Sequence, residues 1–99
     1  MKELYSKLNK VFESRVRLGI MSALVASQEL DFNSLKDLMD LTDGNLASSL
    51  KLLEREGYVK PRKQFIGRKP NTRYLCTAAG RRAFSEHLAV LEKFIDMQK

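Results

Sequence analysis

The sequence has little of the side-chain chemistry that enzymes and secreted proteins need. A single cysteine, Cys76, excludes an internal disulfide framework and cannot by itself build a metal site. A single histidine, His87, argues against a Cys–His or Ser–His–Asp catalytic centre. No apolar run approaches the roughly 18 residues that a bilayer span requires, and no long apolar stretch follows the charge at the N-terminus. We therefore expect no metal, cofactor, secretory signal or membrane partner, and we expect a cytoplasmic protein that is not an enzyme.

The composition is that of a folded domain. Of the 99 residues, 43% are apolar and 30% are charged, which is the balance of a globular rather than a disordered chain. No repeat, low-complexity tract or Pro/Gly/Ser-rich linker divides it, so we expect a single domain over residues 1–99. A chain this short buries only about two-thirds of its unfolded surface, and it would profit from a partner subunit.

Acidic residues are absent from residues 60–73, and this stretch holds six basic residues. The other twelve basic residues balance the twelve acidic ones, so the whole net charge of +6 lies here. A local field of one sign concentrates polyanions and speeds their capture. The alternative interpretation is a solvated loop whose charges keep the chain soluble.

Apolar spacing predicts an N-terminal helix, followed by the first and second helices of the main fold. Residues 1–12 form one N-terminal helix with a single apolar stripe, and Ser14 caps a helix that runs to about residue 27. An extended piece at residues 30–32 precedes a second helix over residues 34–39, capped by Asn33. The inward residues of that second helix are expected to be Leu35, Leu38 and Met39.

A third helix follows after a short break. Thr42 is expected to cap a helix over residues 43–56, which Gly57 ends. Its buried stripe is predicted to consist of Leu46, Leu50 and Leu53.

The pattern then becomes extended. A strand over residues 58–65 contains Pro61, which indicates an edge strand, and turn residues at 67–71 lead to a returning strand at 73–76. Thr77 caps a final helix to about residue 98. This order predicts a mainly α (α+β) fold, a winged helix-turn-helix with a two- to three-stranded wing. Residues 14–76 would be its core, and the terminal helices would form a dimer.

The third helix offers a polar face to a partner. With its leucines turned inward, the opposite side is small and polar, and no acid lies between residues 44 and 53. Such residues allow close approach to a groove and can bond to base edges and phosphates. A merely solvated face is the plain alternative. The candidate DNA contacts on this helix are Thr42, Gly44, Asn45, Ser48, Ser49 and Lys51.

The hairpin supplies a second set of candidate contacts. We expect Arg68 or Lys69 in the minor groove, because a narrow groove has a strongly negative potential. Lys63 and Arg73 would bind phosphates, and Asn71 would shape the turn.

Three groups of residues share a pattern with a known family: residues 41–50 with 53–54 and 57–59; residues 67–72 with Tyr74, Thr77, Gly80, Arg81 and Phe84; and Asn9, Ser14, Val16, Arg17, Leu18 and Ile20. Together they resemble winged-helix transcriptional regulators of the MarR-like type. The resemblance implies a homodimeric DNA-binding repressor or activator, with the third helix in the major groove and dimerisation through the terminal helices. Arg15 stands where these proteins commonly have proline, which leaves the start of that helix less firmly fixed, and Cys76 stands where leucine is usual.

The final helix carries two apolar stripes, Phe84/Leu88/Leu91/Ile95 and Val90/Phe94/Met97. One stripe suffices for a small core, so we expect a second surface, covered partly by the N-terminal segment and partly by a second subunit. The expected interface residues are Leu4, Leu8, Val11, His87, Val90, Leu91, Phe94, Ile95 and Met97.

The single histidine and the single cysteine each allow two interpretations, a packing role and a sensing role. His87 is expected to be packed, and a pH-sensitive dimer is the alternative. Cys76 alternates with Tyr74 and is expected to fill the core, with redox sensing as the alternative.

These features together favour a sequence-specific regulator that binds duplex DNA as a homodimer. Its operator would be an inverted repeat with half-sites roughly one helical turn apart. The rival functions are a winged-helix protein-interaction adaptor and an RNA-binding module. A small-molecule effector is compatible with the sequence but not indicated by it, and would have to bind between the DNA-binding part and the dimer helices.

Overall fold

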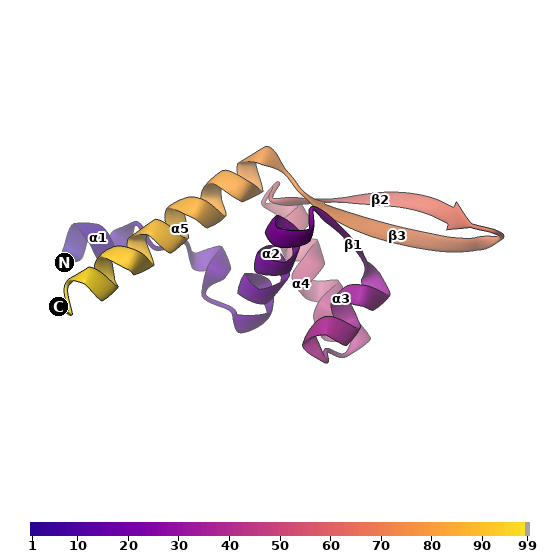
Figure 1. The fold of residues 1–99 in the computed structure, drawn as a ribbon, viewed down its shortest axis with the longest axis horizontal. Coiled ribbons are helices and arrows are strands. Elements are labelled where there is room, and N and C mark those ends of the chain that lie inside the picture. Colours follow the sequence, from indigo (N-terminus) through magenta and orange to yellow (C-terminus); the bar gives the residue numbers. More distant parts are fainter. Residues whose placement is uncertain (99) are drawn as a thin grey trace.

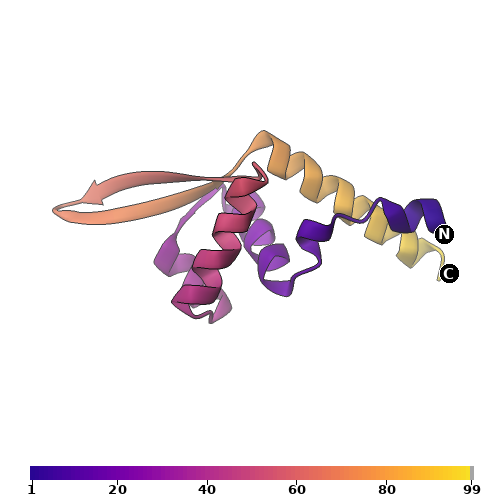
Figure 2. The same cartoon turned by 180° about the vertical axis from the view of Figure 1, so that it is seen from behind.

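A long two-stranded hairpin projects from a body of helices (Figure 1). The structure, a computed structural model, describes residues 1–98. Helix α1 and the C-terminal end of α5 lie at the end of the molecule opposite to the hairpin tip (Figure 2). The elements are α1 (Lys2–Ser6), the 3₁₀ helix η1 (Lys10–Phe12), α2 (Arg15–Ser27), β1 (Glu29–Asp31), α3 (Phe32–Met39), α4 (Asp43–Arg55), β2 (Val59–Ile66), β3 (Lys69–Cys76) and α5 (Ala78–Asp96).

The core lies between α2, α3 and α4 and extends under the base of the hairpin. Leu46, Leu50 and Leu53 are fully buried, which confirms the predicted stripe of α4. The other buried apolar residues are Phe12, Ile20, Met21, Leu24, Leu35, Val59, Phe84 and Val90. This is the α+β winged-helix fold that the order of elements predicts.

Local hydrogen bonds fix the starts of the helices. Ser14, Thr42 and Thr77 cap α2, α4 and α5, and the side-chain oxygen of each accepts from a backbone N–H three residues later. Asn33 was the wrong cap for α3, because the carboxylate of Asp31 accepts from the Ser34 N–H at 2.7 Å. Hydrogen bonds from the side chain and then from the backbone N–H of Ser34 lower the pKa of Asp31 below its ordinary value.

The earlier start of α3 changes which face it buries. Phe32, Leu35 and Met39 pack toward the core at helical spacing. Leu38 lies outside this narrow stripe and is 65% exposed, so its predicted inward position is wrong.

The sheet is antiparallel with the strand order β1–β3–β2. β2 is an edge strand, as Pro61 predicts. The hairpin is longer than expected, because β2 and β3 are joined by only two residues, Gly67 and Arg68. A positive φ of 63° at Gly67, the first loop residue, is typical of a type II′ turn. Asn71 therefore lies within β3 and does not shape the turn, which corrects that prediction.

The predicted continuous helix over residues 1–12 is wrong. α1 ends at Ser6, and Asn9 stands between it and η1. The backbone N–H of Asn9 donates to Nδ1 of His87 (3.1 Å), and its side-chain Nδ2 donates to the hydroxyl of Tyr58 (3.0 Å). These distant partners take the backbone of Asn9 out of a helix that the local apolar spacing favours.

Within residues 1–98, no helix is both long enough and apolar enough to cross a membrane.

Candidate nucleic-acid interface

The open face of α4 is small and polar. Gly44, Asn45, Ser48 and Lys51 are exposed on it, together with the capping residue Thr42. Ser49 was expected at the border of this face as a DNA contact but is only 7% exposed, because it lies one turn from Leu46 and from Leu53 on the buried stripe. Its hydroxyl donates to Oδ1 of Asn45 (3.4 Å). Ser49 therefore orients the Asn45 amide through its oxygen, and the two N–H donors of that amide remain available to a partner.

The charge of Asp43 at the start of α4 is neutralised by Lys36, a residue that the sequence analysis did not single out. The Lys36 ammonium lies 2.8 Å from the Asp43 carboxylate, and both side chains are exposed. This contact joins α3 to α4, and it raises the pKa of Lys36. The acid nearest to the polar face of α4 is thus paired with a cation, so it opposes an approaching phosphate less than an isolated carboxylate would.

The hairpin, which we call the wing (residues 59–76), has two different faces. Directly opposed residues of antiparallel strands share a face, and faces alternate along each strand. The register places Lys60, Arg62, Gln64, Lys69, Asn71 and Arg73 on one face, beside Ile66 and Leu75. The other face carries one cation, Lys63, among Val59, Pro61, Phe65, Pro70, Thr72, Tyr74 and Cys76. Most of the charge therefore lies on one side of the ribbon.

Glu29 of β1 holds two of the wing's arginines. Its Oε1 accepts from Nε of Arg73 at 2.7 Å and also from the guanidinium of Arg62. Arg73 was expected to bind phosphate, but this ion pair occupies it, and only 29% of its side chain is exposed. No sequence signal marks the pair, because 44 residues separate Glu29 from Arg73.

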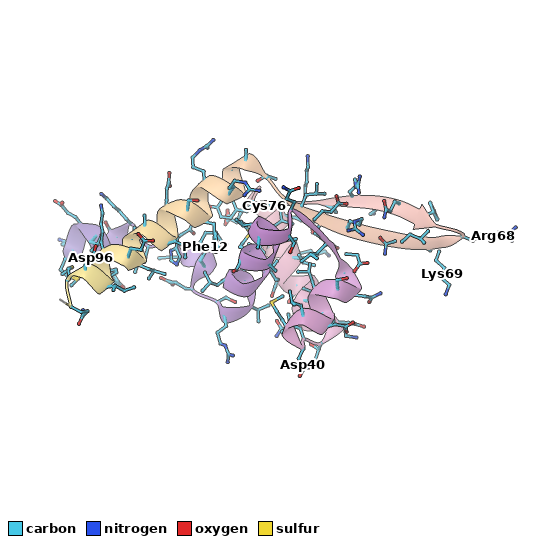
Figure 3. All side chains as sticks on the ribbon, in the orientation of Figure 1. Phe12, Asp40, Arg68, Lys69, Cys76 and Asp96 are labelled. Atoms are coloured by element: carbon cyan, nitrogen blue, oxygen red, sulfur yellow. The ribbon has the colours of Figure 1, made fainter. Side chains whose placement is uncertain are left out.

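The cations nearest the tip are oriented differently. Arg68 and Lys69 extend into solvent at the far end of the hairpin (Figure 3). Lys63 is also exposed, two residues before the last strand positions of β2. Asn71 is held by Gln64, whose Nε2 donates to its Oδ1 (3.2 Å). The predicted wing contacts thus divide into an exposed group (Lys63, Arg68 and Lys69) and an internally bonded group (Asn71 and Arg73).

Most predicted dimer residues lie at the end that carries the termini. Ile95 and Met97 are 60% and 52% exposed, whereas His87 and Val90 are 5% and 7% exposed. Those two residues are already covered within the chain, which removes them from any interface formed without rearrangement. The remaining predicted residues, Leu4, Leu8, Val11, Leu91 and Phe94, are half-buried.

His87 belongs to an aromatic cluster. The Phe12 ring packs against the rings of His87, Tyr58 and Phe84 at centroid distances of 5.3–5.6 Å. Burial lowers the pKa of His87 below its ordinary value of 6.5, and the charge of Glu13 opposes this shift. The packed interpretation of His87 therefore describes its surroundings in the protomer.

Cys76 is half-buried against the core, and its Sγ donates to the Thr77 carbonyl (3.3 Å). Burial raises the pKa of this thiol, opposed by the charge of Arg81. Redox-sensing cysteines have a lowered pKa and are exposed, so these surroundings favour core filling. Within residues 1–98, no three His, Cys, Asp or Glu side chains are grouped so that they could hold a metal ion.

A helix-turn-helix (α3–α4) beside a basic wing defines a class of DNA-binding protein. The chain belongs to the family of winged helix DNA-binding domains, which it matches over residues 16–95. It is 39% identical over 79 residues to an uncharacterised protein of Methanocaldococcus jannaschii, covering 80% of this chain and 86% of that one.

Solved structures agree with this assignment. A transcriptional regulator homologue from Pyrococcus horikoshii is 34% identical, with a TM-score of 0.90 over 100% of this chain and 99% of that one. MarR from E. coli in its oxidised form is 14% identical with a TM-score of 0.75, covering 98% of this chain and 66% of that one, and so shows the shared fold. The protein is therefore a winged-helix DNA-binding protein, and the solved structures that resemble it are described as transcriptional regulators rather than enzymes.

Proposed function

We propose that the protein acts as a homodimer on an inverted-repeat operator. Helix α4 would lie in the major groove, and the wing would contact the backbone and the adjacent minor groove. One observation carries the proposal. The polar face of α4 has no acid between residues 44 and 53, and the wing that follows it carries exposed cations closer to its tip than the two arginines held by Glu29. Neutral donors thus face base edges, while positive charge remains at the position where phosphates would lie.

A salt titration tests the DNA surface. Binding of labelled random duplex DNA, measured by fluorescence anisotropy, should weaken with salt with a slope of about −0.9 per neutralised phosphate. Changing Lys63, Arg68 and Lys69 together to alanine should make that slope shallower by about 2 to 3. The matched control changes Lys2, Lys7 and Lys10 to alanine, which removes the same charge from the exposed N-terminal segment.

The two variants separate the proposed role from a general effect of charge. Equal slopes for both would place the DNA surface elsewhere than on the wing. No binding of the unaltered protein at low salt would favour a protein-interaction adaptor instead.

Base reading is assigned to α4. Asn45→Ala or Ser48→Ala should relax the preference at one base position by about 1–3 kcal/mol if the contact is bidentate. The readout is the ratio of affinities for a selected operator and for random DNA. Arg68→Ala should lower both affinities together, and an equal effect of all three substitutions on both DNAs would contradict this division of roles.

A further inference from the structure

Large apolar side chains occupy the last two strand positions before the wing tip. Phe65 is 73% exposed and Ile66 is 59% exposed, although each lies in the strand β2. Burying large apolar side chains stabilises a fold, so the free chain forgoes this stabilisation at both positions. The tip projects away from the helical body (Figure 3), and the core therefore does not cover these side chains.

The surroundings of the two side chains are cationic. Arg68 and Lys69 follow them after Gly67, Lys63 precedes them, and no acid occurs between residues 60 and 73. This charge matches a polyanion, which an ordinary apolar protein surface is not. The occupant that fits both properties is duplex DNA, whose phosphates bind the cations and whose stacked bases offer apolar surface.

The geometry of the tip suits a narrow groove. The register pairs Phe65 with Pro70 and Ile66 with Lys69, so one apolar side chain lies on each face of the ribbon. The two-residue turn at Gly67 and Arg68 keeps the ribbon narrow to its end. Proteins that bind the minor groove insert Phe, Ile or Pro between base steps, partly unstack them and bend the duplex.

We propose that the wing tip is a minor-groove wedge. Phe65, supported by Pro70 and accompanied by Ile66, enters the groove and opens a base step, while Arg68 and Lys69 hold the flanking phosphates. The inference rests on the proposed DNA-binding function and adds to it a bend and a source of specificity. Pyrimidine–purine steps unstack most readily, so the wedge favours operators with a TA or CA/TG step beneath the wing.

The test measures the unstacking of DNA bases separately from the affinity for DNA. Duplexes rich in TpA steps carry 2-aminopurine in place of adenine, and the fluorescence of this base rises when it unstacks. The chain contains no tryptophan, so protein emission does not interfere at the excitation wavelength of 2-aminopurine. Anisotropy on the same duplexes gives the affinity, and energy transfer between dyes at the two DNA ends gives the bend.

The test variant is Phe65→Thr with Ile66→Thr, which removes the wedge and places β-branched residues, which favour strands, at both positions. We expect the unaltered protein at saturation to raise 2-aminopurine fluorescence several-fold and to shorten the end-to-end distance. The double variant should lose both signals while its affinity falls less than about tenfold. Lys69→Thr, the control at the same tip, should weaken binding and flatten the salt slope yet keep both signals at saturation.

Failure of the wedge can be distinguished from failure of the proposed DNA-binding function. DNA that becomes saturated without unstacking or bending, or that unstacks equally with the double variant, overturns the wedge and leaves the proposed function intact. A protein that binds none of the duplexes overturns both. A double variant that changes sedimentation of the DNA-free protein shows that the tip joins two copies of the chain, and this also overturns the wedge.

Discussion

Gly80 is the residue on which the packing of α5 depends most directly. A Cβ at this position would lie 2.8 Å from the carbonyl carbon of Tyr58, and the backbone there has little freedom to move. Gly44 provides a contrast, because a Cβ there would meet nothing within 4 Å. The packing therefore requires glycine at residue 80 and does not require it at residue 44.

Gly80→Ala should lower the free energy of unfolding by at least about 2 kcal/mol, because the overlap forces α5 away from Tyr58. Gly44→Ala should leave it unchanged or raise it by up to about 1 kcal/mol, since alanine favours helix. Urea denaturation of both variants measures the difference. Equal stabilities would contradict the close contact at Gly80.

His87 should make stability depend on pH. Its Nδ1 accepts the Asn9 N–H only when the ring is neutral, and its pKa in the fold lies below 6.5. Below pH 6.5 the unfolded chain therefore binds a proton that the folded chain resists, and stability falls as the pH falls. The free energy of unfolding should be lower at pH 5 than at pH 7.5, and the difference should shrink in His87→Gln.

The chosen pH window isolates this residue. Asp31, whose pKa is also lowered, loses its contribution only as the pH falls below its ordinary value of 3.8. The charge of Glu13 acts on His87 in the opposite direction and limits the effect. An identical pH response in the variant would show that other groups cause it.

Sequence reasoning at this scale succeeded where the partners are local. Ser14, Thr42 and Thr77 bond three residues ahead, and their roles as caps follow from residue type and position. Asn9 and Arg73 escaped prediction because their partners lie 78 and 44 residues away. Asp31 and Asn33 are both good caps, so only tertiary packing decides between them.

Thr77 joins three elements at the base of the wing. Its N–H donates to the Tyr58 carbonyl (3.0 Å), its hydroxyl donates to the Gly57 carbonyl (2.6 Å), and its oxygen accepts from the Gly80 N–H (2.9 Å). Thr77→Ala should lower the free energy of unfolding by about 1–2 kcal/mol, because the cap and the Gly57 bond are both lost. Thr77→Ser keeps the hydroxyl and should restore most of the loss in the same denaturation assay.

Glu29 on β1 limits how much charge the wing presents. Glu29→Gln should release Arg62 and Arg73, strengthen binding to random DNA several-fold and steepen the salt slope by about 1 to 2. Glu92→Gln makes the same charge change on the exposed surface of α5 and serves as the control. Equal effects of the two substitutions would show that only net charge matters.

The types and order of most elements could be predicted from periodicity and capping, including the edge strand at Pro61. Element lengths could not. β3 begins four residues earlier than predicted, because its pairing with β2 continues to the two-residue turn. The N-terminal segment keeps its apolar spacing but breaks at Asn9, since long-range hydrogen bonds outweigh local helix preference there.

The whole molecule is more extended than a globular chain of its length. Its radius of gyration is 15.0 Å, against roughly 12.6 Å for a typical domain of this length. It exposes 6935 Å², against roughly 5,800 Å² for a compact chain of this mass. Part of the excess belongs to the wing, and part to the end where α1 and α5 expose Tyr5, Ile95 and Met97.

The proposed dimer makes a prediction at this scale. Ile95→Asp should weaken self-association at least tenfold without unfolding the protomer, because this side chain is 60% exposed. Leu38→Asp, at the equally exposed apolar position on α3, should leave association unchanged. Sedimentation equilibrium at micromolar concentration measures both. A stable monomer of the unaltered protein would contradict the proposed dimer.

Gly80 packs closely against the backbone of Tyr58, and Thr77 bonds to Gly57 and Tyr58, so we expect α5 and the base of the wing to move together as one arm. The wing's strands have eight residues, so they extend about 26 Å from that joint. A rotation of the arm by about 7° would move the tip by about 3 Å, close to the 3.4 Å that one base pair occupies along the duplex. In the proposed dimer, the crossing angle of the two α5 helices would therefore set the half-site separation that the protein accepts, and a rotation of about 7–8° of one arm would correspond to about one base pair.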